Sequence, residues 1–294
     1  MGGASERRTP RHKRAHPRPL GRRPSILPLT QRLTPRDLQI LEFCYEHRVF
    51  SINQVCDMFF HSIKIARRRM LILTEEELVD RFKRGNVRNR PHHYILDQLG
   101  ARIIAAHKGI TFRELRWSRE DAQALPWRAD LQHQLDNNEF FVRLIAACRR
   151  EGSHHLTQWW GERHCVRDWE EAVQPDGFAR LEGPSGAIEF FFELDRGTES
   201  PSRLQAKLVR YEDIAQLDGC PQALLFSFPD PEREVAARKR LHNPGITLAT
   251  TVFDIANADP LGAVWLPIGS ERRITLLDVE RETGSGRRRE TDQQ

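Results

Sequence analysis

Residues 175–199 read PDGFARLEGPSGAIEFFFELDRGTE, and this stretch decides the class of the fold. A strand from about Asp176 to Glu182 is followed by the turn sequence Gly183-Pro184-Ser185-Gly186 and by a second strand, Ala187–Leu194. The second strand is apolar apart from Glu189, which is typical of the central strand of a sheet. The stretch therefore predicts an antiparallel hairpin at the centre of an α/β domain.

The sequence on both sides of this hairpin alternates between helical and strand patterns. Before it we expect an amphipathic helix over 130–150 and a short strand near 155–160. After it we expect a helix near 202–217, a strand at 223–228, a helix near 232–241, and strands near 247–253 and 262–266. The order is αβββαβ with additions, which predicts a mixed central sheet.

Carboxylates lie at the two ends of the hairpin that meet. Asp176 starts one strand and Glu193 ends the next, so an antiparallel pairing brings them to the same sheet edge. Asp195 follows Glu193 by two residues and points to the same face if the strand continues. Three oxygen ligands at one edge suit Mg²⁺ or Mn²⁺, which could activate water beside a phosphate. Lys207, in the second turn of the following helix, could assist at that phosphate.

The first ordered segment consists of three predicted helices and two predicted strands. Thr34-Pro35-Arg36-Asp37 is a helix start, and Ser51-Ile52-Asn53-Gln54 matches a capping box. A third helix follows His61-Ser62 and runs to about residue 73, with Ile65, Met70 and Leu73 expected on its apolar side. Strands near 78–82 and 92–96 and a helix near 98–106 complete the segment.

Three helices with a basic third helix, followed by a basic hairpin, are the order of a winged helix-turn-helix. We expect the third helix to enter the major groove of DNA and the hairpin to reach the flanking backbone. The residues expected to contact DNA are Lys64, Arg67 and Arg68 on the helix and Arg84, Arg88 and Arg90 on the hairpin. The alternatives are a solvated charged helix face and a winged helix that contacts proteins.

The charge distribution separates the front of the chain from the back. Residues 1–24 carry a net charge of +7 and residues 61–94 a net charge of +5, whereas residues 130–279 carry −8. A basic front can neutralise phosphates and release counterions. We therefore expect a basic tail over 1–29, a DNA-binding domain over 30–106, a linker over 107–129, an α/β domain over 130–279 and a tail over 280–294.

Composition excludes several classes of protein. No apolar run approaches the roughly 18–20 residues that span a bilayer, and the arginine-rich start has no apolar segment behind it, so it does not resemble a signal peptide. The five cysteines are scattered and never form a C-x-x-C pair, which argues for a reducing compartment. We expect a cytoplasmic protein with no membrane partner.

The strand ends carry a resemblance to known families. Pro175-Asp176, then Glu193-Leu194-Asp195 at the end of a strand, resembles the PD-(D/E)xK nuclease superfamily. Across nearly the whole chain, the sequence looks more narrowly like the replication-relaxation family of plasmid and other mobile-element proteins. The resemblance rests on the winged-helix segment from Thr34 to Ala106, on Pro175-Asp176-Gly177, on the segment from Phe191 to Glu199, and on Lys207 with Tyr211. The resemblance implies DNA binding in replication, or in relaxation and transfer of DNA.

One position departs from the nuclease pattern. The residue two after the glutamate is the catalytic lysine in that superfamily, and here it is Asp195. Either Lys207 takes the place of that lysine or the site has lost activity and kept the fold.

The sequence therefore predicts a fold of the α+β or α/β class, with an N-terminal winged helix-turn-helix before an αβββαβ nuclease-like domain. The partners implied are double-stranded DNA and other replication or mobilisation proteins, and a homodimer stays open. Three functions stay open. The first is a DNA-binding replication-relaxation protein with an inactive nuclease-like domain. The second is an active endonuclease or nickase that uses Mg²⁺ or Mn²⁺ at Asp176, Glu193 and Asp195, and the third is a winged-helix transcriptional regulator.

Overall fold

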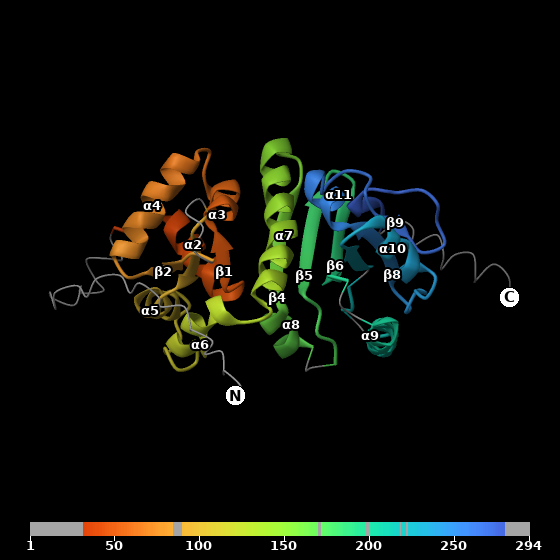
Figure 1. Cartoon of the computed structure of the whole chain (residues 1–294), viewed down its shortest axis with the longest axis horizontal. Helices are drawn as coiled ribbons and strands as arrows, with labels where there is room; N and C mark the ends of the chain where they lie inside the picture. Colours follow the sequence, from red (N-terminus) through yellow and green to blue (C-terminus); the bar gives the residue numbers. More distant parts are fainter. Residues whose placement is uncertain are drawn as a thin grey trace, which may run out of the picture. The chain divides into compact units, whose positions relative to one another are not determined.

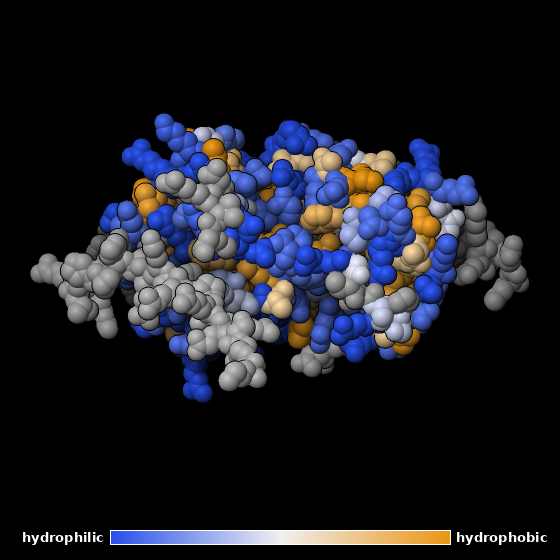
Figure 2. All heavy atoms as spheres, viewed as in Figure 1, coloured by the Kyte–Doolittle hydropathy of each residue, from blue (hydrophilic) through white to orange (hydrophobic). Residues whose placement is uncertain are grey.

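The computed structural model of the chain describes residues 32–84, 90–169, 172–197, 200–217, 219–221 and 223–279. These residues form a mixed α/β structure with a three-stranded and a six-stranded sheet (Figure 1). On the face drawn in Figure 2, hydrophilic residues cover most of the surface and hydrophobic residues show in scattered groups. No helix in the described part combines the length and the apolar character needed to cross a bilayer.

A compact unit begins at Thr34. The predicted tails, residues 1–29 and 280–294, lie outside the described residues. The predicted division into residues 30–106, 107–129 and 130–279 stays a prediction.

Three helices open the compact unit. They are α2 (Pro35–Glu46), α3 (Ile52–Phe59) and α4 (Ile63–Glu75). Both predicted helix starts are confirmed. The side chains of Thr34 and Ser51 each accept a hydrogen bond from the backbone N–H three residues on, and the backbone N–H of each cap residue donates to the side chain of that third residue, Asp37 or Gln54. These caps satisfy backbone N–H groups that a helix leaves without partners at its first turn.

A small antiparallel sheet accompanies these helices. Its strands are β1 (Val49–Ser51), β2 (Val79–Phe82) and β3 (His93–Leu96), in the order β1-β3-β2. The strands predicted near 78–82 and 92–96 are confirmed, and helix α5 (Gln98–His107) follows them. Strand β1 was not predicted, since three residues between two helices carry too little periodicity.

A long helix, α7 (Leu131–Glu151), follows the short helix α6 (Arg119–Ala124) and the 3-10 turn η1 (Leu125–Trp127). Helix α7 contacts α3 and β1, and it also contacts β4, β6 and α11 (Figure 1). Its buried Asn138 donates hydrogen bonds to the carbonyl oxygens of His47 (3.1 Å) and Val49 (2.7 Å). Its Phe140 stacks on Phe192, with ring centroids 4.4 Å apart. The helix therefore packs against both sheets.

The six-stranded sheet is mixed, as the αβββαβ order predicts. Its strands follow the order β4-β5-β6-β7-β8-β9. Strands β4 to β6 pair antiparallel, β6 to β8 pair parallel, and β9 returns antiparallel. Their bounds are β4 (His155–Gly161), β5 (Gly177–Gly183), β6 (Gly186–Leu194), β7 (Ala223–Phe228), β8 (Thr247–Val252) and β9 (Leu266–Pro267).

Four more helices accompany this sheet, namely α8 (Glu162–Asp168), α9 (Pro201–Ile214), α10 (Pro231–Arg238) and α11 (Phe253–Ala258). Alternate residues of β6 face opposite sides of the sheet. Phe192 meets α7, whereas Phe191 lies in a core shared with α9 and α10. This alternation places Glu193 on the α9 side.

The strand predicted near 262–266 was wrong over most of its length. The amide of Gly262 bonds the carbonyl of Asp259, and the amide of Val264 bonds the carbonyl of Gly262. These local turn bonds replace ladder bonds, so β9 begins only at Leu266. Helices α8 and α11 were also missed, since each is only one to two turns long.

Candidate functional site

Helix α4 presents three cations to solvent. Lys64, Arg67 and Arg68 are all exposed, and within the described residues the structure shows no ion pair for any of them. The buried side of the helix is formed by Ala66, Met70 and Leu73. These spacings of four and three residues define one face of a helix. The charged side is therefore free to meet a partner.

Ile65 corrects the sequence prediction for this helix. It was expected on the apolar side, but its side chain is 57% exposed. Met70 and Leu73 fix the phase of the buried face, and Ala66, four residues before Met70, fills the position instead. Ile65 thus lies beside the cations rather than beneath them.

An ion pair ties α4 to the first turn of α2. The Nε of Arg69 donates to Asp37 Oδ1 at 2.7 Å, and a second guanidinium nitrogen bonds Asp37 Oδ2. Asp37 also closes the cap at Thr34. Burial alone would raise the pKa of the Asp37 carboxyl, but the hydrogen bonds from Arg69 and Thr34 outweigh it and hold that pKa below its usual value. The pair fixes how α4 lies against α2.

The predicted hairpin cations are described only in part. Arg84 donates to the side chain of Gln132 on α7, and Arg90 donates to the carbonyl of Arg84 at 3.3 Å. Arg88 lies outside the described residues.

Asp176 is held at the junction of α7 and the hairpin. Its Oδ1 lies 2.7 Å from His133 Nε2, and its Oδ2 accepts from the backbone N–H of Leu194 at 2.8 Å. Asn137 donates to its carbonyl oxygen at 2.8 Å. Burial alone would lower the pKa of His133, but the hydrogen bond to Asp176 and the negative charges of Asp176 and Glu193 together outweigh it and raise that pKa. His133 therefore serves as the donor.

The residue after Asp176 must be small. A Cβ on Gly177 would lie 2.9 Å from ring carbons of Phe141, closer than real contacts allow. Because Gly177 pairs with Phe192 in the sheet, this close approach sets Asp176 beside the end of β6.

Glu193 is buried against α9. Its side chain accepts hydrogen bonds from Lys207 Nζ and Tyr211 OH, each at 2.7 Å, and the residue is 1% exposed. Lys207 and Tyr211 are four residues apart and so share one face of α9. The pKa of the Glu193 carboxyl is raised from 4.5 to about 7, mainly because the group is buried. The positive charge of Lys207 lowers this pKa, and the negative charge of Asp176 raises it.

Asp195 turns to a different helix. Its Oδ2 accepts from Arg233 of α10 at 2.8 Å and 2.6 Å, and its Oδ1 accepts from the backbone N–H of Gly197 at 2.6 Å. The structure thus brings Asp176, Glu193 and Lys207 together, whereas Asp195 is held by Arg233.

All six oxygens of the three carboxyl groups already have a donor from the protein. In the described part of the chain, no group of three or more His, Cys, Asp or Glu residues is arranged to hold a metal ion. One donor leaves a further lone pair on a carboxylate oxygen, so a metal ion would have to share these oxygens with the donors that already hold them. Whether the carboxylates bind metal stays a prediction.

Two partners in this site were not anticipated from the sequence. His133 is 43 residues from Asp176, and Arg233 is 38 residues from Asp195. Tyr211 belongs to the motif that carried the resemblance, and its position four residues after Lys207 was the signal for its contact with Glu193.

The variant Glu193→Gln is expected to weaken the pH dependence of stability. With the pKa raised to about 7, the folded protein keeps a proton that the unfolded chain, near 4.5, releases. The free energy of unfolding therefore falls as pH rises from about 4.5 to 7. We expect this fall to shrink by about 1–3 kcal/mol in Glu193→Gln. Urea unfolding at pH 5 and pH 8 measures it, with Glu189→Gln on the same strand as control. Equal pH dependence in wild type and Glu193→Gln would refute the assignment.

A family model described as Replication-relaxation matches residues 41–226, more than half of the 294-residue chain. The chain belongs to the replication-relaxation family. The predicted family is thereby confirmed. No curated protein and no solved structure matches this replication-relaxation protein.

The family match places the site in context. Its range contains α4 and runs through Asp176, Glu193 and Lys207. Asp37 and Arg233 lie outside it. The family description points to a role of this replication-relaxation protein in replication or mobilisation.

Proposed function

We propose that this replication-relaxation protein binds double-stranded DNA in replication or mobilisation and holds the duplex with α4. The observation that most strongly supports DNA binding is the exposed face of α4, where Lys64, Arg67 and Arg68 have no ion pair within the described residues. Surface cations that are left unneutralised gain free energy by replacing the counterions of DNA. An exposed helix of this size fits the major groove.

The order of elements around α4 supports the same proposal. Helices α2, α3 and α4 are followed by the antiparallel pair β2 and β3, which is the order of a winged helix-turn-helix. In that architecture the third helix reads the groove and the hairpin reaches the backbone. Arg84, Arg88 and Arg90 are the proposed backbone contacts of the hairpin.

We assign the nuclease-like domain a non-catalytic role as a docking platform for other replication or mobilisation proteins. The support is the arrangement of Asp176, Glu193 and Asp195, whose oxygens are all occupied by protein donors. Arg233 in particular neutralises Asp195, whose side chain is 1% exposed. A cation would have to compete with these donors for the carboxylate oxygens.

Metal-dependent cleavage of DNA is the second candidate. It is favoured by one observation, the contact of 2.7 Å between Lys207 and Glu193 beside Asp176, which puts a cation where a phosphate would need one. It ranks lower because the protein donors to Asp176, Glu193 and Asp195 would compete with a metal ion for the carboxylate oxygens.

One experiment separates the two candidates. The purified protein is incubated with supercoiled plasmid and Mg²⁺ or Mn²⁺, beside Glu193→Ala and an EDTA control. We expect wild type and Glu193→Ala to retard the plasmid equally in a gel and to leave it supercoiled. Conversion to open-circular or linear DNA that Glu193→Ala and EDTA both abolish would establish the nuclease instead. Absence of any retardation at 50 mM salt would overturn the DNA-binding proposal.

A further inference from the structure

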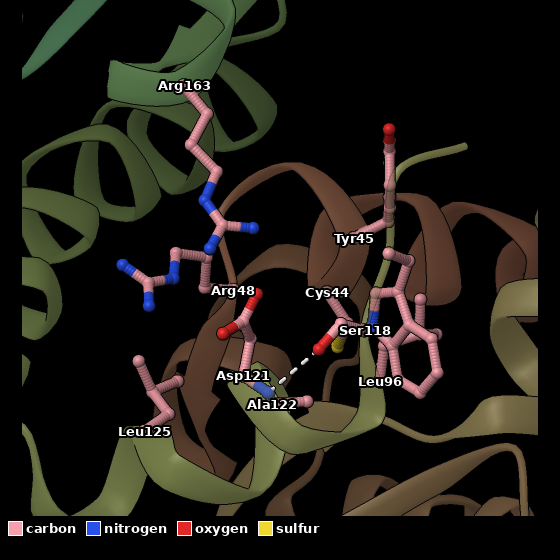
Figure 3. Close-up of a pocket in the computed structure, with 10 residues that line it drawn as sticks. Cys44, Tyr45, Arg48, Leu96, Ser118, Asp121, Ala122, Leu125 and Arg163 are labelled. Carbon is pink, nitrogen blue, oxygen red and sulfur yellow. Dashed lines mark hydrogen bonds between the residues drawn. The ribbon is translucent and has the colours of Figure 1, made fainter. Parts of the chain in front are cut away.

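Two arginines line one pocket outside the sites described above. Arg48 follows the end of α2, and Arg163 lies on α8. Figure 3 shows the side chain of Arg163 reaching from α8 toward Arg48. The rest of the pocket is lined by α2, β3, α6 and η1, including Tyr45, Ser118 and Asp121.

Arg48 occupies a backbone conformation that disfavours a side chain. Its φ is +71°, in the left-handed region, immediately after the C-terminal end of α2. Glycine is the usual residue at such a position, because it has no Cβ to clash. A half-buried arginine in this conformation is unusual, which suggests that its side chain has a functional role at this position.

The two guanidinium groups lack internal neutralisation. Among the described residues, neither Arg48 nor Arg163 has a side-chain hydrogen bond or an ion pair. Three carboxylates lie near Arg48, those of Asp121, Asp130 and Glu162. Asp130 is already paired with Arg128 at 2.7 Å.

The electrostatics agree with two cations held close together. Burial, together with the positive charges of Arg163 and Arg128, lowers the pKa of Arg48 to about 10. The charges of Asp130 and Glu162 act in the opposite direction but do not outweigh these effects. An anion between Arg48 and Arg163 would relieve the repulsion.

We propose that Arg48 and Arg163 bind a phosphate group. Guanidinium groups match the geometry of phosphate oxygens with paired N–H donors. Among the residues that line the pocket, the two arginines face the single carboxylate of Asp121, and this excess of positive charge favours an anionic ligand. A phosphodiester or a free phosphate is such an anion.

The two sources of such a phosphate are distinguished by two arms of one experiment. The variants are Arg163→Gln and Arg48→Gln, and the control is Arg167→Gln, an exposed arginine on the same helix that pairs with Asp168 at 3.2 Å. The first arm measures the thermal midpoint with and without inorganic phosphate. The second measures the affinity for a 40-base-pair duplex by fluorescence anisotropy, and it alone rests on the proposed function.

A free-phosphate site predicts that phosphate raises the midpoint of wild type and Arg167→Gln but not of Arg163→Gln or Arg48→Gln. A DNA-backbone site predicts that Arg163→Gln binds the duplex about 3- to 10-fold more weakly, with a salt slope lower by about 1, while Arg167→Gln matches wild type. Equal behaviour of Arg163→Gln and Arg167→Gln in both arms would overturn the proposal. Loss of DNA binding by wild type would overturn the proposed function and leave the first arm to decide this site.

Discussion

The variant Lys64→Ala/Arg67→Ala/Arg68→Ala is expected to bind duplex DNA about 100-fold more weakly than wild type at 0.15 M salt. Each cation contributes about 1 kcal/mol through phosphates or base edges, and about 1.4 kcal/mol corresponds to a factor of ten. All three side chains are exposed, so their loss leaves the core of α4, formed by Ala66, Met70 and Leu73, unchanged. Fluorescence anisotropy with a labelled duplex measures the affinity.

A matched triple variant separates the position of the charges from their number. The variant Lys239→Ala/Arg240→Ala/Arg272→Ala also removes three positive charges, but from exposed residues in the part of the chain that forms the six-stranded sheet. We expect its affinity to remain within about 3-fold of wild type at this salt concentration, where charges more than about 8 Å from the DNA are largely screened. Equal losses in the two triple variants would mean that net charge, and not α4, controls binding.

Arg69→Ala is expected to lower the free energy of unfolding by about 2–4 kcal/mol, because it leaves the Asp37 carboxylate buried without its partner. The side chain of Asp37 is 1% exposed and that of Arg69 is 26% exposed, so the loss falls below that for a fully buried pair. Urea unfolding at pH 7 measures the change.

Arg67→Ala, two residues away on the same helix, is the control and is expected to change stability by less than about 0.5 kcal/mol. Since the pKa of Asp37 is held below its usual 3.8, the stabilisation by the pair is fully present above pH 4 and is lost as the pH falls below that value. A stability of Arg69→Ala equal to that of wild type at pH 7 would contradict the structural role of the pair.

Features governed by local rules could be predicted from the sequence. The caps at Thr34 and Ser51 depend on residues three positions apart, and both appear as predicted. The hairpin turn at 183–186 fixed the register that pairs Gly177 with Phe192, which in turn brought Asp176 beside the end of β6. Lys207 reached Glu193 because α9 follows the strand after a short connection.

Features governed by packing between distant segments could not be predicted from the sequence. Asp195 was expected to join Glu193, but α10 carries Arg233 against it, and no local pattern reveals that contact across 38 residues. The burial of Asp37 depends in the same way on Arg69 of another helix. Ile65 was misplaced because its hydrophobicity favours burial, whereas the buried face of α4 is formed by Ala66, Met70 and Leu73.

Protection of Lys64 from chemical acetylation by bound duplex DNA tests the central claim most directly. Lys64 and Lys239 are both exposed lysines of the same chain, so Lys239 serves as an internal reference. With saturating 40-base-pair duplex at 50 mM salt, we predict that the acetylation rate of Lys64, measured by mass spectrometry, falls at least about 5-fold while that of Lys239 is unchanged, as expected for a lysine held against phosphates. An unchanged rate at Lys64 would contradict the claim that α4 holds the DNA.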